Sequence, residues 1–302
     1  MVDAPRRGWQ ARLRSAVQFP LSRMVIAVVF VGGATLLVVV ALQRLNRVLP
    51  FSGSPALTLL VTLVEVLTAF AAYAAYVRLV ERQPVVELAP RRAAIESALG
   101  LAAGVTLLAL TVALIWLAGQ VQVAAAHPAW GSVLGLFSLA VISGCVEELI
   151  ARGIVFRILE EGLGTWWALL LSALVFGALH ARNPNATVVS TMAIASSTKI
   201  LLAAAYVVTR RLWLPIGLHV GWNFAEGGIF GLAVSGRETH GILDSKLGSR
   251  ALISGGGFGV EASIFVVILG LLCGGLLLGL AAKRRRLLRP SWRNRRPPPE
   301  AG

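Results

Sequence analysis

VEASIFVVILGLLCGGLLLGLAA, residues 260–282, is an almost unbroken apolar run. About 20 such residues are needed for an α-helix to cross the hydrocarbon core of a bilayer. A basic run follows at once, formed by Lys283, Arg284, Arg285, Arg286 and Arg289. Basic residues next to a span favour its cytoplasmic end. The sequence therefore predicts a membrane-spanning helix here, with the C-terminus in the cytoplasm.

The rest of the chain has the same character. Of its 302 residues 57% are hydrophobic and only 14% charged, with a mean hydropathy of +0.77, whereas soluble domains carry about 25% charged residues. We predict an all-α fold, a polytopic membrane helical bundle of about eight transmembrane helices. The predicted spans are 24–42, 56–77, 97–119, 131–151, 165–181, 187–209, 212–232 and 260–282.

The basic residues indicate topology and not nucleic-acid binding, because they collect at the chain ends and in short loops. An even number of spans places both termini on the same side of the membrane, and the basic residues at both ends indicate that this side is the cytoplasm. The expected inner loops hold Arg78, Arg82, Arg91, Arg92, Arg157, Arg210 and Arg211, and the outer exceptions are Arg44, Arg47, Arg237, Lys246 and Arg250. The expected localisation is thus a multi-pass protein of the cell membrane.

The predicted domain organisation follows from these runs. Residues 1–23 form a basic cytoplasmic segment, and 24–282 form the transmembrane domain. The first span is too long for the apolar region of a signal peptide, so we expect it to be retained. Residues 283–302 are expected to be a disordered basic tail rich in proline, and 233–259, with three consecutive glycines, a long flexible loop.

Charged and strongly polar side chains are few within the apolar runs. A charged side chain at the bilayer centre costs at least about 2.5–3.5 kcal/mol, so such residues usually face a cavity or a partner. The set comprises Glu65, Glu147, Glu148, Arg152, His180, Lys199, His219 and Asn223. Cys145 and Cys273 also lie in apolar runs, where we expect free thiols and no disulfide.

CVEELIARG, residues 145–153, concentrates three of these charges. Glu148 and Arg152 are four residues apart on one helix face, in the order that favours an ion pair. Glu147 projects about 100° away, so we expect Glu148 to be the partner of Arg152 and Glu147 to be free. The alternative is a charge cluster at the cytoplasmic end of a helix, where charges are tolerated.

The other polar residues fall on two later spans. His180 lies near the end of its span, where a histidine is often only a hydrogen-bonded polar residue. His219 and Asn223 share a helix face four residues apart, and a packing hydrogen bond between helices would also explain them.

Together these side chains suit hydrolysis. Glu147 and His180 could hold and deprotonate a water, while His219 and Asn223 could donate to the oxyanion of a scissile carbonyl. Glu147, His180 and His219 would also make a zinc set with an open position, although no HExxH motif is present. No cofactor is certain, and a divalent metal such as zinc is possible.

Three motifs carry a family resemblance: EExxxR at 147–152, FxxxH at 176–180 and HxxxN at 219–223. Their order and spacing resemble the CPBP intramembrane proteases, also called the CAAX prenyl endopeptidase and bacteriocin-processing or Abi family. TRRLWLPIGLHVGWNF, residues 209–224, is similar to that family as well. The resemblance covers about residues 130–230, which we take as the protease core.

The resemblance implies an intramembrane endopeptidase with a buried polar catalytic cavity. In it Glu147 and His180 would activate water, His219 and Asn223 would stabilise the oxyanion, and Glu148 and Arg152 would support them. The expected substrate is a peptide or membrane protein, with prenylation left open. Lys199 departs from the family pattern and is expected to extend to the membrane interface, or else to pair with a carboxylate such as Glu226. If it faced the catalytic cavity instead, it could alter the choice of substrate or indicate lost activity. We expect Glu65 to make a hydrogen bond between helices.

Two other functions compete with proteolysis. An immunity or scaffold protein could bind a peptide in the same cavity without cleaving it. A proton-coupled transporter could use the intramembrane glutamates and histidines, although the sequence shows no internal repeat of the kind many transporters have.

Overall fold

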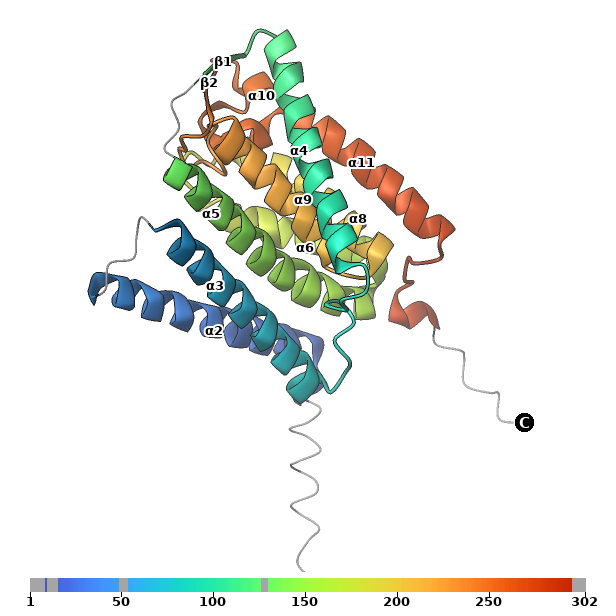
Figure 1. The fold of residues 1–302 in the computed structure, drawn as a ribbon. Coiled ribbons are helices and arrows are strands. Elements are labelled where there is room, and N and C mark those ends of the chain that lie inside the picture. The colour runs from blue at the N-terminus through green and yellow to red at the C-terminus, as the bar shows by residue number, and fades with distance from the viewer. Residues whose placement is uncertain (1–8, 10–15, 49–53, 126–129, 295–302) are drawn as a thin grey trace, which may run out of the picture.

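The computed structural model describes residue 9 and residues 16–48, 54–125 and 130–294. The described chain is a helical bundle with one small antiparallel sheet (Figure 1). Its longer helices are α2 (Pro20–Val48), α3 (Pro55–Tyr76), α4 (Ala93–Leu117), α5 (Trp130–Glu148), α6 (Arg157–His180), α7 (Val188–Ser196), α8 (Thr198–Thr209), α9 (Trp213–Asn223) and α11 (Ile264–Lys283).

Shorter elements join these helices. They are the π-helical segments η1 (Val77–Glu81), η2 (Leu149–Phe156) and η3 (Phe224–Ile229), the strands β1 (Val121–Ala125) and β2 (Leu243–Leu247), helix α10 (Ala251–Ser254), and the 3₁₀ turns η4 (Gly256–Phe258), η5 (Val260–Ala262) and η6 (Ser291–Asn294). Two of the π-helical segments adjoin predicted site residues, Glu148 before η2 and Asn223 before η3. Such segments occur frequently at functional sites.

The all-α membrane fold is confirmed, but the number of spans differs from eight. Within the described residues six helices are long and apolar enough to cross a membrane. The predicted spans 131–151 and 165–181 fall in one run of helix, Trp130–His180, which counts once among the six although Gly164 interrupts it. Helix α9 and η3 comprise only 11 and 6 residues, fewer than the about 20 that a crossing requires.

The run Trp130–His180 is broken at Gly164. A straight helix of 51 residues would be about 77 Å long, more than twice the thickness of the hydrocarbon core. Gly164 has φ 77° and ψ 169°, a conformation that ends a helix and that favours glycine. The break separates the two predicted spans, 131–151 and 165–181, and permits the chain to turn back.

Helices α4 and α9 approach each other closely because glycines line their contact. Gly217 and Gly221 on α9 face the backbone of Ser97 and Leu101 on α4, and Gly100 and Gly104 face the backbone of α9 in return. Small residues spaced by four are typical of helix packing in membranes, where they let two backbones meet. This contact fixes the position of the helix that carries HxxxN.

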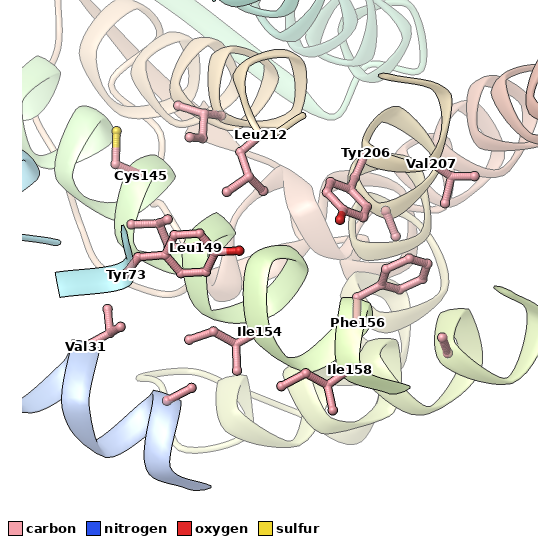
Figure 2. Packing of buried hydrophobic residues seen from close by; sticks show 14 of the residues in the cluster. Val31, Tyr73, Cys145, Leu149, Ile154, Phe156, Ile158, Tyr206, Val207 and Leu212 are labelled. Carbon is pink, nitrogen blue, oxygen red and sulfur yellow. The ribbon is translucent and has the colours of Figure 1, made fainter. Parts of the chain in front are cut away.

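The hydrophobic core includes side chains of the motif-bearing segment η2. Leu149, Ile154 and Phe156 pack with side chains from α3 and α8, including Tyr73 and Tyr206 (Figure 2). The Tyr73 hydroxyl also donates to the carbonyl of Gly153 at 3.1 Å. Outside this core, many large apolar side chains are exposed, such as Leu276 on α11, as expected of helices that face lipid.

Two predicted flexible segments are folded. The 233–259 loop contains β2, α10 and η4, and β2 pairs with β1 from Val121↔Leu247 to Ala125↔Leu243. Residues 284–294 of the expected disordered tail fold back on the break in α6, where Thr165 and Leu288 exchange hydrogen bonds. Backbone pairing therefore orders both segments. Residues 295–302 of the tail, and all but one of residues 1–15, lie outside the described residues.

Candidate functional site

A cavity of about 560 Å³ lies between α5, the end of α6 and the segment after η3. Three of the predicted catalytic residues line it: Glu147 from α5, His180 from α6 and Asn223 from α9. The fourth, His219, is buried beside the cavity and is not part of its lining. The structure thus brings together residues that are up to 76 positions apart in the sequence, from Glu147 to Asn223.

The predicted ion pair in the first motif is present. Arg152 Nη1 donates to Glu148 Oε1 at 2.8 Å, and both side chains are buried. Arg152 Nη2 donates to the carbonyl of Lys199 at 2.8 Å, which ties α8 to η2. These charges lie well inside a continuous helix and not at its end, because the helix runs on from α5 through η2 to Gly164. The alternative of a charge cluster at a helix end is therefore wrong.

His219 is held by the same glutamate. Its Nδ1 lies 3.0 Å from Glu148 Oε1, and because a carboxylate oxygen can only accept, Nδ1 is the donor. Its Nε2 lies 3.9 Å from Glu147 Oε2. The two adjacent glutamates therefore contact opposite nitrogens of one ring. Glu148 therefore orients the His219 ring. The other side of that ring faces Glu147, which lines the cavity.

Glu147 is not free of charged neighbours, contrary to the sequence-based expectation. The Lys199 ammonium lies 3.7 Å from Glu147 Oε2, and Lys199 is 6% exposed. The interpretation that Lys199 extends to the membrane interface is wrong, because Lys199 is buried and its nitrogen lies beside the Glu147 carboxylate and over an aromatic ring. The alternative that Lys199 pairs with a carboxylate is confirmed, but the carboxylate is Glu147 and not Glu226. Glu147 Oε2 itself is buried without a hydrogen-bond partner among the described residues, so it has unused acceptor capacity.

Phe176, the first residue of FxxxH, connects the cation to the histidine. The Lys199 nitrogen lies 4.1 Å from the centre of its ring, within the range of a cation–π interaction. The His180 ring lies 5.2 Å away at an angle of 33°. His180 Nδ1 is 2.9 Å from the carbonyl of Phe176, and since that oxygen accepts, Nδ1 carries the proton. In the neutral ring Nε2 is then left as a proton acceptor.

Asn223 and Ser143 form a further polar pair in the cavity. Asn223 Nδ2 donates to Ser143 Oγ at 3.2 Å, and both residues line the cavity. Ser143 is four residues before Glu147 and so lies on the same side of α5. The structure thus shows Ser143 in contact with the amide of the third motif.

The segments at the rim of the cavity were not predicted. They contribute Asn183 after α6, and Ser235, Arg237, Glu238 and Thr239 after η3. The only signal in the sequence was that these polar residues follow directly on spans that carry motifs. Because they lie in connections with no helical periodicity, their direction could not be inferred.

The arrangement of the side chains does not favour a metal site. Within the part of the chain that the structure describes, no group of three or more His, Cys, Asp and Glu side chains could hold a metal ion. The possible set of Glu147, His180 and His219 is therefore not assembled as one. An ammonium beside Glu147 also opposes a second cation at the same carboxylate, since like charges repel.

The remaining intramembrane residues take structural positions. Glu65 on α3 is buried but makes no hydrogen bond within the described residues, so the expected bond between helices is not found. Cys145 and Cys273 are free, as expected. None of these three side chains lines the cavity.

Comparisons with known proteins agree with the motifs. Residues 128–225 match the family model of the type II CAAX prenyl endopeptidases, Rce1-like. Over 119 residues the chain is 27% identical to the "Putative membrane peptidase YdiL" of Bacillus subtilis (strain 168), an alignment that spans 39% of this chain and 44% of that protein. No solved structure matches. The resemblance to the CPBP intramembrane proteases is thus confirmed for residues 128–225, which carry all three motifs and match the type II CAAX prenyl endopeptidase family.

Proposed function

We propose that this protein is an intramembrane endopeptidase that hydrolyses a peptide bond with a water molecule activated by Glu147 and His180. The observation that carries the proposal is that Glu147, His180 and Asn223, from three separate helices, line one cavity in a helical membrane domain. The family match over residues 128–225 supports peptidase chemistry for the same segment.

The proposed reaction starts at Glu147. Its side chain lines the cavity and is 34% exposed, so the carboxylate can accept a hydrogen bond from a water there. The carboxylate takes a proton from that water as the water oxygen attacks the carbonyl carbon of the scissile bond. The C–N bond then breaks, and the proton passes to the leaving amine. His180 lines the same cavity with Nε2 available as an acceptor, so it can hold the water or share its proton.

Asn223 and His219 are the proposed donors to the oxyanion. The Asn223 amide can turn from Ser143 to the substrate, since serine is a neutral and therefore weaker partner than an oxyanion. His219 can donate through Nε2 when both of its ring nitrogens carry protons, and Glu148 holds the ring in place for this. Loss of one oxyanion donor typically lowers the turnover rate by about 10²–10³-fold.

The experiment is a cleavage assay with the full chain reconstituted in lipid vesicles. A library of membrane-anchored peptides is incubated with the wild-type protein and with Glu147→Gln, and products are identified by mass spectrometry. We expect products from the wild type and none above background from the variant. Parallel reactions with a chelator test the metal dependence that the sequence left open.

Glu65→Gln is the matched control. It makes the same chemical change at another buried glutamate of the membrane domain, on a helix that does not line the cavity. We expect its products to equal those of the wild type. If the peptides bind to the wild type but no bond is cut, the chain is a binding protein and the proposal is wrong.

A further inference from the structure

The helical bundle has two opposite ends, and each is defined by contacts between the segments that connect or terminate the helices. At the first, Arg23 of α2 is paired with Glu81 at 2.8 Å and with Glu161 at 2.6 Å. At the same end Arg210 pairs with Glu160 at 2.5 Å. Arg211 pairs with Glu96 there as well, and Arg286 donates to the carbonyl of Val208. We call this end the terminal face; it comprises residues 20–23, 77–96, 157–165, 209–213 and 283–292.

The opposite end is built from the other connections. Strands β1 and β2 pair there, and Asn183 and Asn185 donate to the carbonyls of Ser235 and Gly236 at 3.2 and 3.3 Å. We call this end the distal face; it comprises residues 44–48, 117–125, 181–187 and 231–263. Figure 1 shows β1, β2 and α10 at the top of the bundle, away from the C-terminus at the lower right.

The two faces differ in charge. Among the described residues the terminal face has thirteen basic and five acidic side chains, and the distal face has six basic and three acidic ones. The basic residues of the terminal face are Arg23, Arg78, Arg82, Arg91, Arg92, Arg157, Arg210, Arg211, Lys283, Arg284, Arg285, Arg286 and Arg289. Connections rich in lysine and arginine remain in the cytoplasm. The distal face therefore lies on the extracytoplasmic side.

The cavity belongs to the distal face. Its rim residues Asn183, Ser235, Arg237, Glu238 and Thr239 all come from the connections of that face. Its deeper lining comes from within the bundle, and no lining residue comes from the terminal face as defined above. A substrate that enters the cavity from the aqueous side thus passes the distal rim.

The lining also indicates the chemistry of the substrate. Leu139 on α5 and Leu179 on α6 line the cavity and are 62% and 58% exposed, so an apolar chain in the membrane can contact both. Arg237 and Glu238 are exposed at the rim, and neither side chain has a partner among the described residues. The cavity therefore combines an apolar side wall with charged groups of both signs at the aqueous rim.

We infer that the cavity receives its substrate from the extracytoplasmic side: a membrane-anchored peptide whose apolar part contacts Leu139 and Leu179 and whose charged flank meets Arg237 and Glu238. This rests on the proposed function. It makes cytoplasmic prenylated tails unsuitable substrates, because their scissile bond lies at the other membrane surface.

Cysteine labelling tests the sidedness without any need for activity. Glu238→Cys places a thiol at the rim and Arg289→Cys places one at the terminal face, both at exposed positions. Spheroplasts of an expressing bacterium are treated with a membrane-impermeant maleimide before or after lysis. We expect Glu238→Cys to be labelled in intact spheroplasts and Arg289→Cys only after lysis. The wild type, whose two cysteines lie within the spans, gives the background. Labelling of Glu238→Cys only after lysis overturns the inference.

A sided cleavage assay separates this inference from the proposed function. The wild-type protein is held in right-side-out vesicles, and one membrane-anchored peptide is presented from outside or enclosed within. Cleavage only of the outer peptide supports the inference. Cleavage only of the enclosed peptide leaves proteolysis intact and refutes the extracytoplasmic route. If neither peptide is cut while labelling follows the expected pattern, the sidedness of the cavity is upheld, whereas the proposed hydrolysis and the substrate class inferred from it are refuted.

Discussion

Removal of the Arg152 side-chain charge should strongly destabilise the membrane domain. At 2.8 Å and an effective dielectric constant of about 20, the attraction between Arg152 and Glu148 is about 6 kcal/mol. The loss of one partner leaves the other charge buried, which typically costs about 3–5 kcal/mol. Glu148 is fully buried, its Oε2 has no partner among the described residues, and after the change its Oε1 keeps only the hydrogen bond from His219 Nδ1. Arg152→Met should therefore lower the free energy of unfolding by about 3–5 kcal/mol.

The assay is denaturant unfolding in detergent micelles, monitored by tryptophan fluorescence. Arg78→Met is the control, because Arg78 is exposed and makes no ion pair within the described residues, and we expect a change below about 0.5 kcal/mol. Glu148→Gln and the double variant Glu148→Gln/Arg152→Met complete a cycle. The double variant should cost at least about 1 kcal/mol less than the two single changes together, since the charges are removed as a pair.

Two results would refute this reasoning. If Arg152→Met lowers the free energy of unfolding by no more than the Arg78→Met control, the pair does not carry the predicted energy. If the two single changes are additive in the double variant, Arg152 and Glu148 do not interact in the folded protein.

Three further predictions concern the neighbours of the cavity. Lys199→Met should lower the turnover rate by about 10–100-fold, because Glu147 loses its nearest compensating cation. Lys199→Arg should keep part of the rate. Equal rates for the wild type and both variants would contradict a role for the ammonium. Gly221→Ala should destabilise the fold by about 1–3 kcal/mol in the unfolding assay, because the added carbon meets the Leu101 backbone. The control Gly275→Ala should not, because its added carbon meets no atom within 4 Å. Equal effects of the two changes would argue against the close contact of α4 with α9. Phe176→Leu should lower the turnover rate by about 10-fold relative to the wild type, since both the cation–π contact with Lys199 and the ring contact with His180 are lost. An unchanged rate would show that the Phe176 ring positions neither Lys199 nor His180.

The sequence predicted much of the fold and three of the residues that line the cavity, Glu147, His180 and Asn223. Apolar runs identify helices that lie in a bilayer, and polar residues within such runs are few enough to be conspicuous. The spacing of Glu148 and Arg152 was sufficient to predict their ion pair, which depends only on helix geometry.

Features that depend on distant contacts could not be predicted. The burial of Lys199 against Phe176 and Glu147 requires α5, α6 and α8 to be placed in three dimensions, and the residue alone is equally compatible with a position at the membrane interface. The distal loop contains glycines that suggest flexibility, yet its strand β2 pairs with β1, which precedes it by over 100 residues. The continuity of α5 with α6 was also hidden, because Arg152 and Arg157 interrupt the apolar run while they are buried by ion pairs.

The turnover rate of reconstituted Glu147→Gln, at equal amounts of folded protein, tests the central claim most directly. The substitution keeps the size of the side chain and removes the group proposed to deprotonate water. The account predicts a rate at least about 100-fold below that of the wild type, with peptide binding retained. A variant that cleaves the same bond at the rate of the wild type would contradict the assignment of Glu147 as the base.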